Sequence, residues 1–211
     1  MADYRDAILR PFRDLKTMLL GGLINAIPIV NLAGIGYALQ CATHHSNSPP
    51  KWDALPRLWL DGLLVTLGSL IYMLPGIILV LIGVISVTFD LTPGQTPALA
   101  AWQLAFIILG ILWFLFAQYI LPAAQVHYAI DGRLRSMFEF SEVIKQALTF
   151  NYLKTWLFVL LWSVVLSIAG FILSILTFIT LIGPLYVNGL ITYTILVTAF
   201  TLFGETYLEG N

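Results

Sequence analysis

Long uncharged apolar runs, separated by short polar segments, form the hydrophobic pattern of this chain. Residues 62–89 contain no Asp, Glu, Lys or Arg, and neither do residues 91–126, of which 100–123 form the best span. An α-helix needs about 20 apolar residues to cross the hydrocarbon core of a bilayer. The pattern therefore predicts transmembrane helices over 62–89 and 100–123, joined by the Pro- and Gly-containing loop 90–98.

The last apolar run, residues 155–204, is uncharged throughout and too long for one span. As a single helix it would extend about 75 Å, more than twice the hydrocarbon thickness of about 30 Å. Gly183 and Pro184 lie close to its middle, and both residue types interrupt helices. The run therefore predicts a pair of spans, 155–181 and 185–206, with a turn between them.

Residues 17–43 form a further uncharged run that contains Gly21, Gly22 and Pro28. One straight helix over this run would be about 40 Å long, which exceeds the hydrocarbon thickness of about 30 Å. Pro28 lies near the midpoint and breaks helices because it lacks a backbone N–H. Two structures fit: a single crossing, or a re-entrant hairpin whose short arms enter the membrane and return to the same side.

The basic residues favour the hairpin. All ten lie in three segments: Arg5, Arg10, Arg13 and Lys16 before the run; Lys51 and Arg57 after it; and Arg133, Arg135, Lys145 and Lys154 before the last pair of spans. Loops rich in Lys and Arg stay in the cytoplasm. A single crossing would separate the first and last segments, whereas a hairpin places all ten residues and both termini on the cytoplasmic side.

The predicted fold is therefore all-α, a polytopic helical membrane protein with one integral membrane domain over 1–211. Its parts are an amphipathic start and re-entrant hairpin over 1–43, four full transmembrane helices, and amphipathic interfacial helices. Five transmembrane helices are the alternative, if residues 17–43 cross the membrane once.

A short internal similarity agrees with the hairpin. Two segments share a Pro, an Asn and a Tyr in the same order: Pro28, Asn31 and Tyr37, and Pro184, Asn188 and Tyr193. The match needs a one-residue gap, and chance is the competing explanation. A true repeat would mean two units that enter the membrane from the cytoplasm in the same orientation.

Aromatic residues mark two interfacial segments. In residues 136–150, Ser136 and Glu139 have the spacing of a capping box, and apolar residues recur at helical spacing, which predicts a membrane-surface helix. The other segment lies just before the first predicted span and combines prolines with tryptophans. The expected interfacial anchors are Trp52, Trp59, Phe138 and Phe140.

The expected binding region is the hairpin tip. Asn25 and Asn31 flank the break at Pro28, where side-chain amides can pair backbone groups that the break leaves free. Asn188 occupies the corresponding position in the last pair of spans. For the other small and polar residues of the spans, helix packing is the simpler explanation.

Composition narrows the function. Of 211 residues, 59% are hydrophobic and 10% charged, which excludes an ordinary soluble domain. A net charge of -1 leaves no basic surplus for nucleic acid. No span carries an ionisable residue at mid-depth, which argues against a proton pump, an ion-coupled transporter and an intramembrane protease. With Cys41 as the one cysteine, no intramolecular disulfide forms, and no cofactor motif is found.

The turns and interfacial residues resemble those of a prokaryotic integral-membrane family, domain of unknown function 4013. The residues that carry the resemblance are Gly21-Gly22, Ile27-Pro28, Asn31, Gly36-Tyr37, Pro50, Trp52-Asp53, Asp61-Gly62, Tyr72, Pro75, Tyr128-Ala129, Arg133, Phe138 and Phe140. The resemblance implies a compact multi-pass domain in a bacterial or archaeal cell (inner) membrane, and it supplies no established activity. The chain is more loosely similar to the membrane domains of glycerophosphodiester phosphodiesterases.

We therefore expect a non-enzymatic membrane protein that binds lipid or a partner membrane protein, without cofactor or metal. The alternative is a permease or translocation channel for an uncharged or lipid-like solute, gated by the hairpin. An enzyme would require convergence of five cytoplasmic residues: His44, His45, His127, Asp53 and Asp131. The three histidines could also form a metal site, although an interfacial loop explains them equally well.

Overall fold

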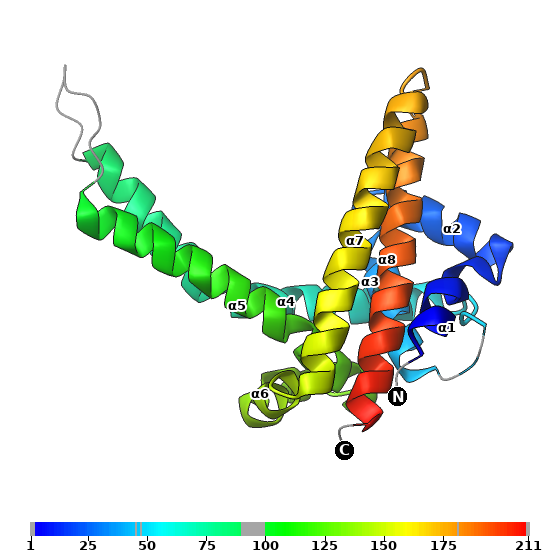
Figure 1. Cartoon of the computed structure of the whole chain (residues 1–211), viewed down its shortest axis with the longest axis horizontal. Coiled ribbons are helices and arrows are strands. Elements are labelled where there is room, and N and C mark those ends of the chain that lie inside the picture. Colours follow the sequence, from blue (N-terminus) through cyan, green and yellow to red (C-terminus); the bar gives the residue numbers. More distant parts are fainter. Residues whose placement is uncertain (1–2, 45, 47, 90–99, 181, 210–211) are drawn as a thin grey trace. The chain divides into compact units, whose positions relative to one another are not determined.

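The structure of the chain is a computed structural model that describes residues 3–44, 46, 48–89, 100–180 and 182–209. All elements in these ranges are helices (Figure 1): α1 Tyr4–Leu9, the 3-10 helix η1 Arg10–Phe12, α2 Leu15–Ala26, α3 Leu32–Thr43, α4 Leu55–Phe89, α5 Ala101–Asp131, the 3-10 helix η2 Leu134–Phe138, α6 Phe140–Ala147, α7 Phe150–Leu176 and α8 Ile182–Glu209. The predicted loop 90–98 and His45 lie outside the described residues.

The prediction of an all-α protein with four spans is confirmed. Within the described ranges, α4, α5, α7 and α8 are long and apolar enough to cross a membrane. Residues 17–43 do not form one helix, because α2 and α3 have 12 residues each and are separated by residues 27–31. The five-span alternative, in which this broken segment crosses the membrane once, stays open. Re-entry of this helical hairpin into a bilayer stays a prediction.

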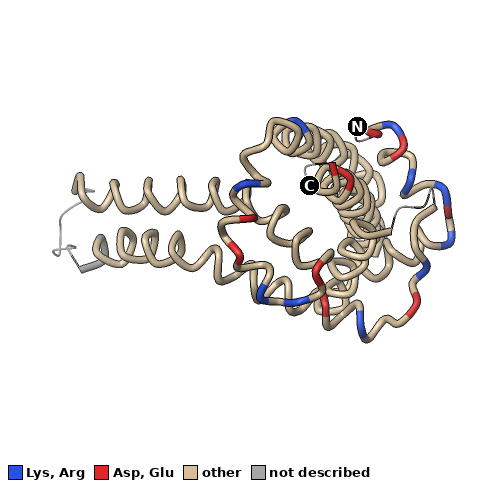
Figure 2. Tube along the Cα trace, turned by 90° about the horizontal axis from the view of Figure 1, so that it is seen from below, with Lys and Arg blue, Asp and Glu red and all other residues tan. Residues whose placement is uncertain are grey.

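The described residues fall into two compact units. The first consists of residues 1–66 and 122–211, and the second of residues 67–121, so that α4 and α5 contribute to both. The described residues of the second unit include no Lys, Arg, Asp or Glu, whereas the first unit carries charges at its helix ends and loops (Figure 2). The prediction of a single domain stays a prediction.

Glycines pack the two helices of the second unit. A Cβ atom added to Gly110 would lie 2.9 Å from the carbonyl oxygen of Gly76, and one added to Gly83 would lie 2.9 Å from that of Gln103. The indole N–H of Trp113 donates to the carbonyl oxygen of Tyr72 at 2.8 Å. Small residues and interhelical hydrogen bonds thus hold α4 against α5, as is usual for membrane helices.

Helix α8 is the central helix of the first unit and packs against α2, α3 and α7. A Cβ atom on Gly189 would lie 2.1 Å from the carbonyl oxygen of Gly22, and one on Gly204 would lie 2.1 Å from that of Ala42. These close approaches fix α2 near the start of α8 and the end of α3 near the end of α8. The hairpin is therefore docked along much of the last helix.

The two ends of the hairpin meet at Arg10. This side chain is 3% exposed and donates to two carbonyl oxygens at the end of α3. One belongs to Cys41 in the last turn of α3, and the other to His44 directly after the helix. It also donates to the hydroxyl of Thr201 on α8 at 2.7 Å. Because Arg10 precedes α2, these bonds show that the chain returns after α3 to the place from which α2 begins.

The two chain ends also lie together in the first unit (Figure 1). The backbone N–H of Asp3 donates to a carboxylate oxygen of Glu205 at 3.0 Å. The hydroxyl groups of Tyr4 and Thr155 are 3.5 Å apart, which places α1 at the start of α7. The described terminal helices and the segment before α7 therefore share one end of this unit.

Asp14 begins α2. Its carboxylate accepts hydrogen bonds from the backbone N–H groups of Lys16 and Thr17, at 3.0 and 3.1 Å. The hydroxyl of Thr17 also donates to it at 2.8 Å. This last bond is the main cause that holds the pKa of Asp14 below its ordinary value. The sequence Asp14-Leu15-Lys16-Thr17 is thus a local N-terminal cap for the hairpin.

The two tyrosines of the internal similarity meet in the core. The rings of Tyr37 and Tyr193 are 5.9 Å apart, and both side chains are buried beside Ile24 and Val197. Tyr37 lies near Tyr193, and Ala42 near Gly204, so α3 and α8 run in the same direction. A common orientation of equivalent helices is what a parallel repeat would produce.

Two local predictions were wrong. Gly183 and Pro184 lie in the first turn of α8 instead of in the turn after α7, because proline is compatible with the first turn of a helix. Ser136 does not cap the interfacial helix: its hydroxyl donates to the carbonyl oxygen of Arg133, and α6 begins at Phe140 with Glu139 as its N-cap.

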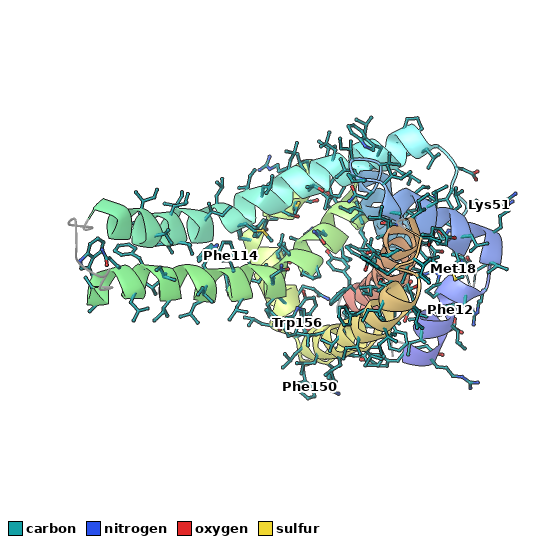
Figure 3. All side chains as sticks on the ribbon, turned by 90° about the horizontal axis from the view of Figure 1, so that it is seen from above. Phe12, Met18, Lys51, Phe114, Phe150 and Trp156 are labelled. Atoms are coloured by element: carbon teal, nitrogen blue, oxygen red, sulfur yellow. The ribbon has the colours of Figure 1, made fainter. Side chains whose placement is uncertain are left out.

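Apolar side chains cover the outside of the helices. On α6, Phe140 and Ile144 are exposed while Val143 and Ala147 are buried, so the predicted apolar stripe is divided between an outer and an inner face. Phe150 at the start of α7 also projects outward (Figure 3) and is 68% exposed. Exposed apolar surface of this extent is expected of a protein surrounded by lipid.

Candidate functional site

The predicted residues of the hairpin tip do not pair its backbone. The amide of Asn25 donates to the carbonyl oxygen of Gly21, within its own helix, at 2.8 Å. Asn31 is exposed and precedes α3 without a capping side-chain hydrogen bond. Pro28 is exposed in the turn, and Asn188 is exposed on α8. A binding role for these four residues stays a prediction.

Two of the predicted anchors, Trp52 and Trp59, also contact the hairpin, and their interfacial role stays a prediction. The indole N–H of Trp59 donates to the carbonyl oxygen of Ile29 at 2.8 Å, at a residue with φ +71°. A positive φ strains a β-branched residue, and this hydrogen bond supports the strained tip. The ring of Trp52 stacks on Tyr37 with centroids 3.9 Å apart, and its N–H donates to the carbonyl oxygen of Thr17.

The other two predicted anchors belong to the segment before α7. Phe138 is partly buried at the end of η2, whereas Phe140 is 52% exposed at the start of α6. The ammonium of Lys154 lies 4.3 Å from the ring centroid of Phe150. This part of the surface therefore presents aromatic and basic groups together, which is typical of a membrane interface.

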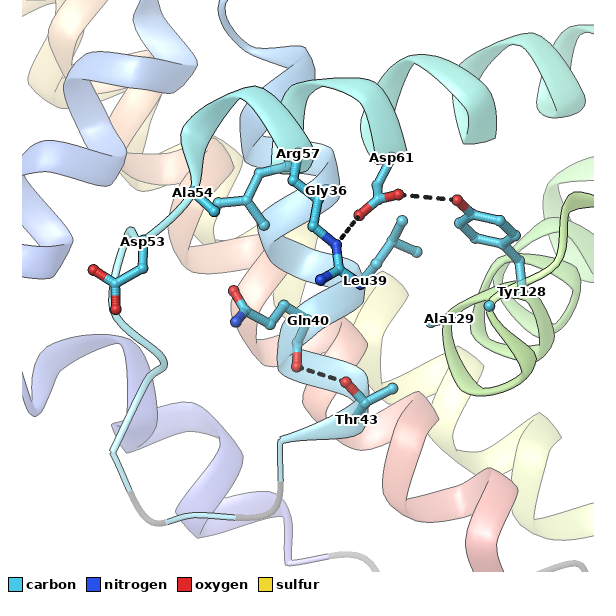
Figure 4. Close-up of a pocket in the computed structure, with 12 residues that line it drawn as sticks. Gly36, Leu39, Gln40, Thr43, Asp53, Ala54, Arg57, Asp61, Tyr128 and Ala129 are labelled. Atoms are coloured by element: carbon cyan, nitrogen blue, oxygen red, sulfur yellow. Dashed lines mark hydrogen bonds and ion pairs between the residues drawn. The ribbon is translucent and has the colours of Figure 1, made fainter.

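The first unit contains a pocket of about 330 Å³ where three helix ends come together. We call it the polar pocket (Figure 4). It lies between the end of α3, the start of α4 and the end of α5, and its walls combine apolar and polar groups. The polar side chains that line it are Gln40, Thr43, Asp53, Arg57, Asp61 and Tyr128.

A short chain of polar contacts forms one wall of the polar pocket. The hydroxyl of Tyr128 donates to a carboxylate oxygen of Asp61 at 3.1 Å, and Nε of Arg57 lies 3.9 Å from the other oxygen. The side chain of Arg57 is 84% exposed, so its guanidinium retains donors directed to solvent. The carboxylate of Asp61 thus lies between the hydroxyl of Tyr128 on α5 and the guanidinium of Arg57 on α4.

Close backbone packing shapes the floor of the polar pocket. A Cβ atom on Gly36 would lie 1.9 Å from the carbonyl oxygen of Leu58, and one on Gly62 would lie 1.8 Å from that of Leu32. These glycines bring α3 and the start of α4 into backbone contact. Ala54, at φ +56°, turns the chain into α4 at the pocket rim.

The polar pocket also holds a buried acceptor. Oε1 of Gln40 is buried and meets no hydrogen-bond donor among the described residues. Buried polar atoms in folded proteins almost always have a partner, and an exception calls for a water or a ligand. A residue that lines the pocket thus has a side-chain oxygen without a donor among the described residues.

The described residues that an enzyme would need do not line one common pocket. Asp53 lines the polar pocket, whereas His44 lines a smaller pocket with Arg10. His127 lies 3.7 Å from Glu139, and Asp131 accepts two hydrogen bonds from Arg133. Among the described residues, no group of three His, Cys, Asp or Glu side chains has the geometry of a metal site.

Two features were not predicted from the sequence: the polar pocket and the buried position of Arg10. Gln40, Asp61 and Tyr128 lie far apart in the chain, so no local motif connects them. The spacing of Arg57 and Asp61 is a usable signal, because residues four apart share one helical face. Arg10 was counted only as a cytoplasmic charge, although it is the buried residue that joins the hairpin ends to α8.

The fold and the polar pocket define an all-helical, multi-pass membrane protein. The family described as "Protein of unknown function (DUF4013)" matches residues 19–178, more than half of the chain. The chain belongs to this family. No curated protein and no solved structure matches it, and the similarity to glycerophosphodiester phosphodiesterase membrane domains stays a prediction.

Proposed function

We propose that this protein is a non-enzymatic membrane protein that binds a membrane lipid, with the polar pocket as the site for the lipid headgroup. The polar pocket is the observation that carries the proposal. It lies at helix ends, where chains that cross a bilayer pass through the headgroup layer. Its volume of about 330 Å³ is at the lower end of the usual range for ligand pockets.

The surface beside the polar pocket suits an acyl chain. Leu60 and Leu64 follow one another on α4 at helical spacing around Asp61, and they are 53% and 37% exposed. A lipid can place its polar group against Asp61 and its apolar part along these leucines. The same combination of polar and apolar contacts is found in most ligand sites.

The permease alternative lacks a comparable observation. A solute pathway needs a continuous polar face, but three threonines of α8 turn their hydroxyls to their own helix. Thr194, Thr201 and Thr206 donate to the carbonyl oxygens four residues earlier, at 2.8, 2.7 and 2.8 Å. The cluster of Ile24, Tyr37, Tyr193 and Val197 also places apolar and aromatic side chains between the hairpin and α8. These contacts favour packing over passage.

Lipid retention tests the proposal. The full chain is purified in mild detergent, and its bound lipid is measured by native mass spectrometry. Ala129→Trp places an indole in the polar pocket and is expected to abolish retention. Ile130→Trp puts the same group at an exposed neighbouring position and is the matched control. Wild-type protein without bound lipid, or an Ala129→Trp variant that retains it, would refute the proposal.

We further propose that the hairpin is re-entrant and that both termini are cytoplasmic, in a prokaryotic inner membrane. Each arm of 12 residues rises about 18 Å, less than the hydrocarbon thickness of about 30 Å. Single cysteines at the exposed positions Ser48 and Arg135, in a Cys41→Ser background, are labelled in intact cells. Both positions should be protected from an impermeant reagent, and opposite sidedness would refute the hairpin.

A further inference from the structure

We infer that the polar pocket selects a phospholipid whose headgroup carries a primary ammonium beside its phosphate, as in phosphatidylethanolamine. This inference rests on the proposed function, because it concerns the same pocket. It specifies the chemistry of the headgroup from the groups that line the pocket.

The charges of the pocket favour a ligand with a cationic group. Two carboxylates, Asp53 and Asp61, line it together with one guanidinium, Arg57. Arg57 compensates one of the two negative charges, so the lining has a net charge of -1 at neutral pH. A headgroup with only negative charge would be repelled by the second carboxylate.

The hydrogen-bonding groups require that the cation carry N–H donors. A primary ammonium has three N–H donors and no acceptor. Oε1 of Gln40 is buried and lacks a donor among the described side chains, while Asp53 and Asp61 supply further acceptors. A trimethylated ammonium has no N–H and would leave the oxygen of Gln40 unpaired. The pocket therefore discriminates between ethanolamine and choline headgroups.

The start of α4 supplies the complementary site for the phosphate. Arg57 lies in the first turn of this 35-residue helix, and its guanidinium is mostly exposed at the pocket. The helix dipole attracts anions at this end. The backbone N–H groups of Arg57 and Leu58 bond to the carbonyl oxygen of Ala54, so the guanidinium of Arg57 supplies the donors for the phosphate. Figure 4 shows Arg57 and Gln40 on neighbouring elements, α4 and α3, so that the phosphate and ammonium sites adjoin one another.

The selectivity is tested with nanodiscs and native mass spectrometry. The full chain is offered phosphatidylethanolamine, phosphatidylcholine and phosphatidylglycerol with identical acyl chains. We expect a preference of about tenfold for phosphatidylethanolamine, the effect of one charge-assisted hydrogen bond. Asp61→Asn and Gln40→Leu should each reduce this preference, whereas Glu142→Gln, at an exposed site on α6, should leave it unchanged.

The outcomes separate this inference from the proposed function. Equal retention of the three lipids, lost in Ala129→Trp, would overturn the selectivity and leave lipid binding intact. No retention of any lipid would overturn both. Soluble glycerophosphoethanolamine is the second probe: if it binds while phosphatidylethanolamine in nanodiscs does not, the ligand is a free amine and the lipid assignment is wrong. A variant with altered selectivity must remain monodisperse to count as support.

Discussion

The two compact units use the same helix-packing chemistry but differ in their polar groups. In the second unit, Gly76, Gly83 and Gly110 bring α4 and α5 together, and a tryptophan indole bonds to a backbone carbonyl. The first unit repeats both devices and adds a buried Arg10 and the polar pocket. Small residues are therefore sufficient to pair two spans, whereas a polar site arises where several helix ends meet.

Cys41 provides a way to measure this difference. It is the one cysteine of the chain and is 1% exposed in the core of the first unit. A thiol reagent reaches this buried side chain when the first unit opens around it, so the labelling rate reports on the first unit. Thermal unfolding in detergent reports on the whole protein. The four predictions below compare these two measurements.

The largest effect is expected from an added methyl group in the first unit. Gly62→Ala would place Cβ 1.8 Å from the carbonyl oxygen of Leu32, which is backbone and cannot rotate away. We expect destabilisation of about 3 kcal/mol or more and rapid labelling of Cys41. Gly110→Ala in the second unit is the control: it should lower thermal stability and leave Cys41 protected. Equal protection of Cys41 in both variants would contradict the division into two units.

Removal of Arg10 should have the next largest effect. Arg10→Leu leaves the carbonyl oxygens of Cys41 and His44 and the hydroxyl of Thr201 without their donor. Loss of a buried, charge-assisted network costs about 2–4 kcal/mol. The expected result is a lower unfolding temperature together with faster labelling of Cys41. Arg5→Leu changes an exposed residue of the same segment and should have little effect. If the two variants behave alike, Arg10 does not hold the hairpin.

The tryptophan bonds allow a direct comparison between the units. Trp59→Phe removes the bond to the carbonyl oxygen of Ile29, and Trp113→Phe removes the bond to that of Tyr72. Each change should cost about 1 kcal/mol, the usual value of one hydrogen bond.

The two variants should lose stability in different units of the protein. Trp59→Phe is expected to accelerate the labelling of Cys41, because the hairpin tip loses its support. Trp113→Phe should destabilise the protein by a similar amount without this acceleration. An increase of labelling in Trp113→Phe would show that the units do not open separately.

The smallest effect concerns pH. The pKa of Asp14 is lowered in the folded state, mainly by the hydroxyl of Thr17. A carboxyl group with a lowered pKa stabilises the fold above its unfolded pKa, about 3.9, and this stabilisation is lost as the pH falls through the folded pKa. The unfolding temperature should therefore fall in this acidic range. Asp14→Asn retains a capping side chain without the titration and should flatten the dependence. An unchanged acid dependence in this variant would exclude Asp14 as its source.

The spans could be predicted from the sequence because uncharged runs of sufficient length have few alternatives in a membrane protein. Pro28 likewise predicted the break between α2 and α3, since proline removes a backbone donor. Helix bounds were less accurate, because Gly183 and Pro184 are compatible both with a turn and with the first turn of a helix. Local chemistry alone does not distinguish these two cases.

The polar pocket could not be predicted, because it depends on which helix ends adjoin. In the sequence, Asp61 and Tyr128 are two separate polar residues near the ends of predicted spans. The structure shows that they are hydrogen-bonded to each other at 3.1 Å. The anchors Trp52 and Trp59 were identified as interfacial by residue type, although their N–H groups bond to the hairpin. Long-range contacts of this kind leave no periodic signal in the sequence.

The docking of the hairpin on α8 has a consequence for the order of synthesis. The hairpin ends at Thr43 and its partner helix begins at Ile182, so the ribosome adds about 140 residues between them. At roughly 5–20 residues per second, this interval is on the order of 10 s. During that time the glycine face of α2 has no α8 to contact. The packing of the hairpin is thus completed only by the last of the described helices, and a nascent chain that stops before α8 lacks the helix on which the hairpin docks.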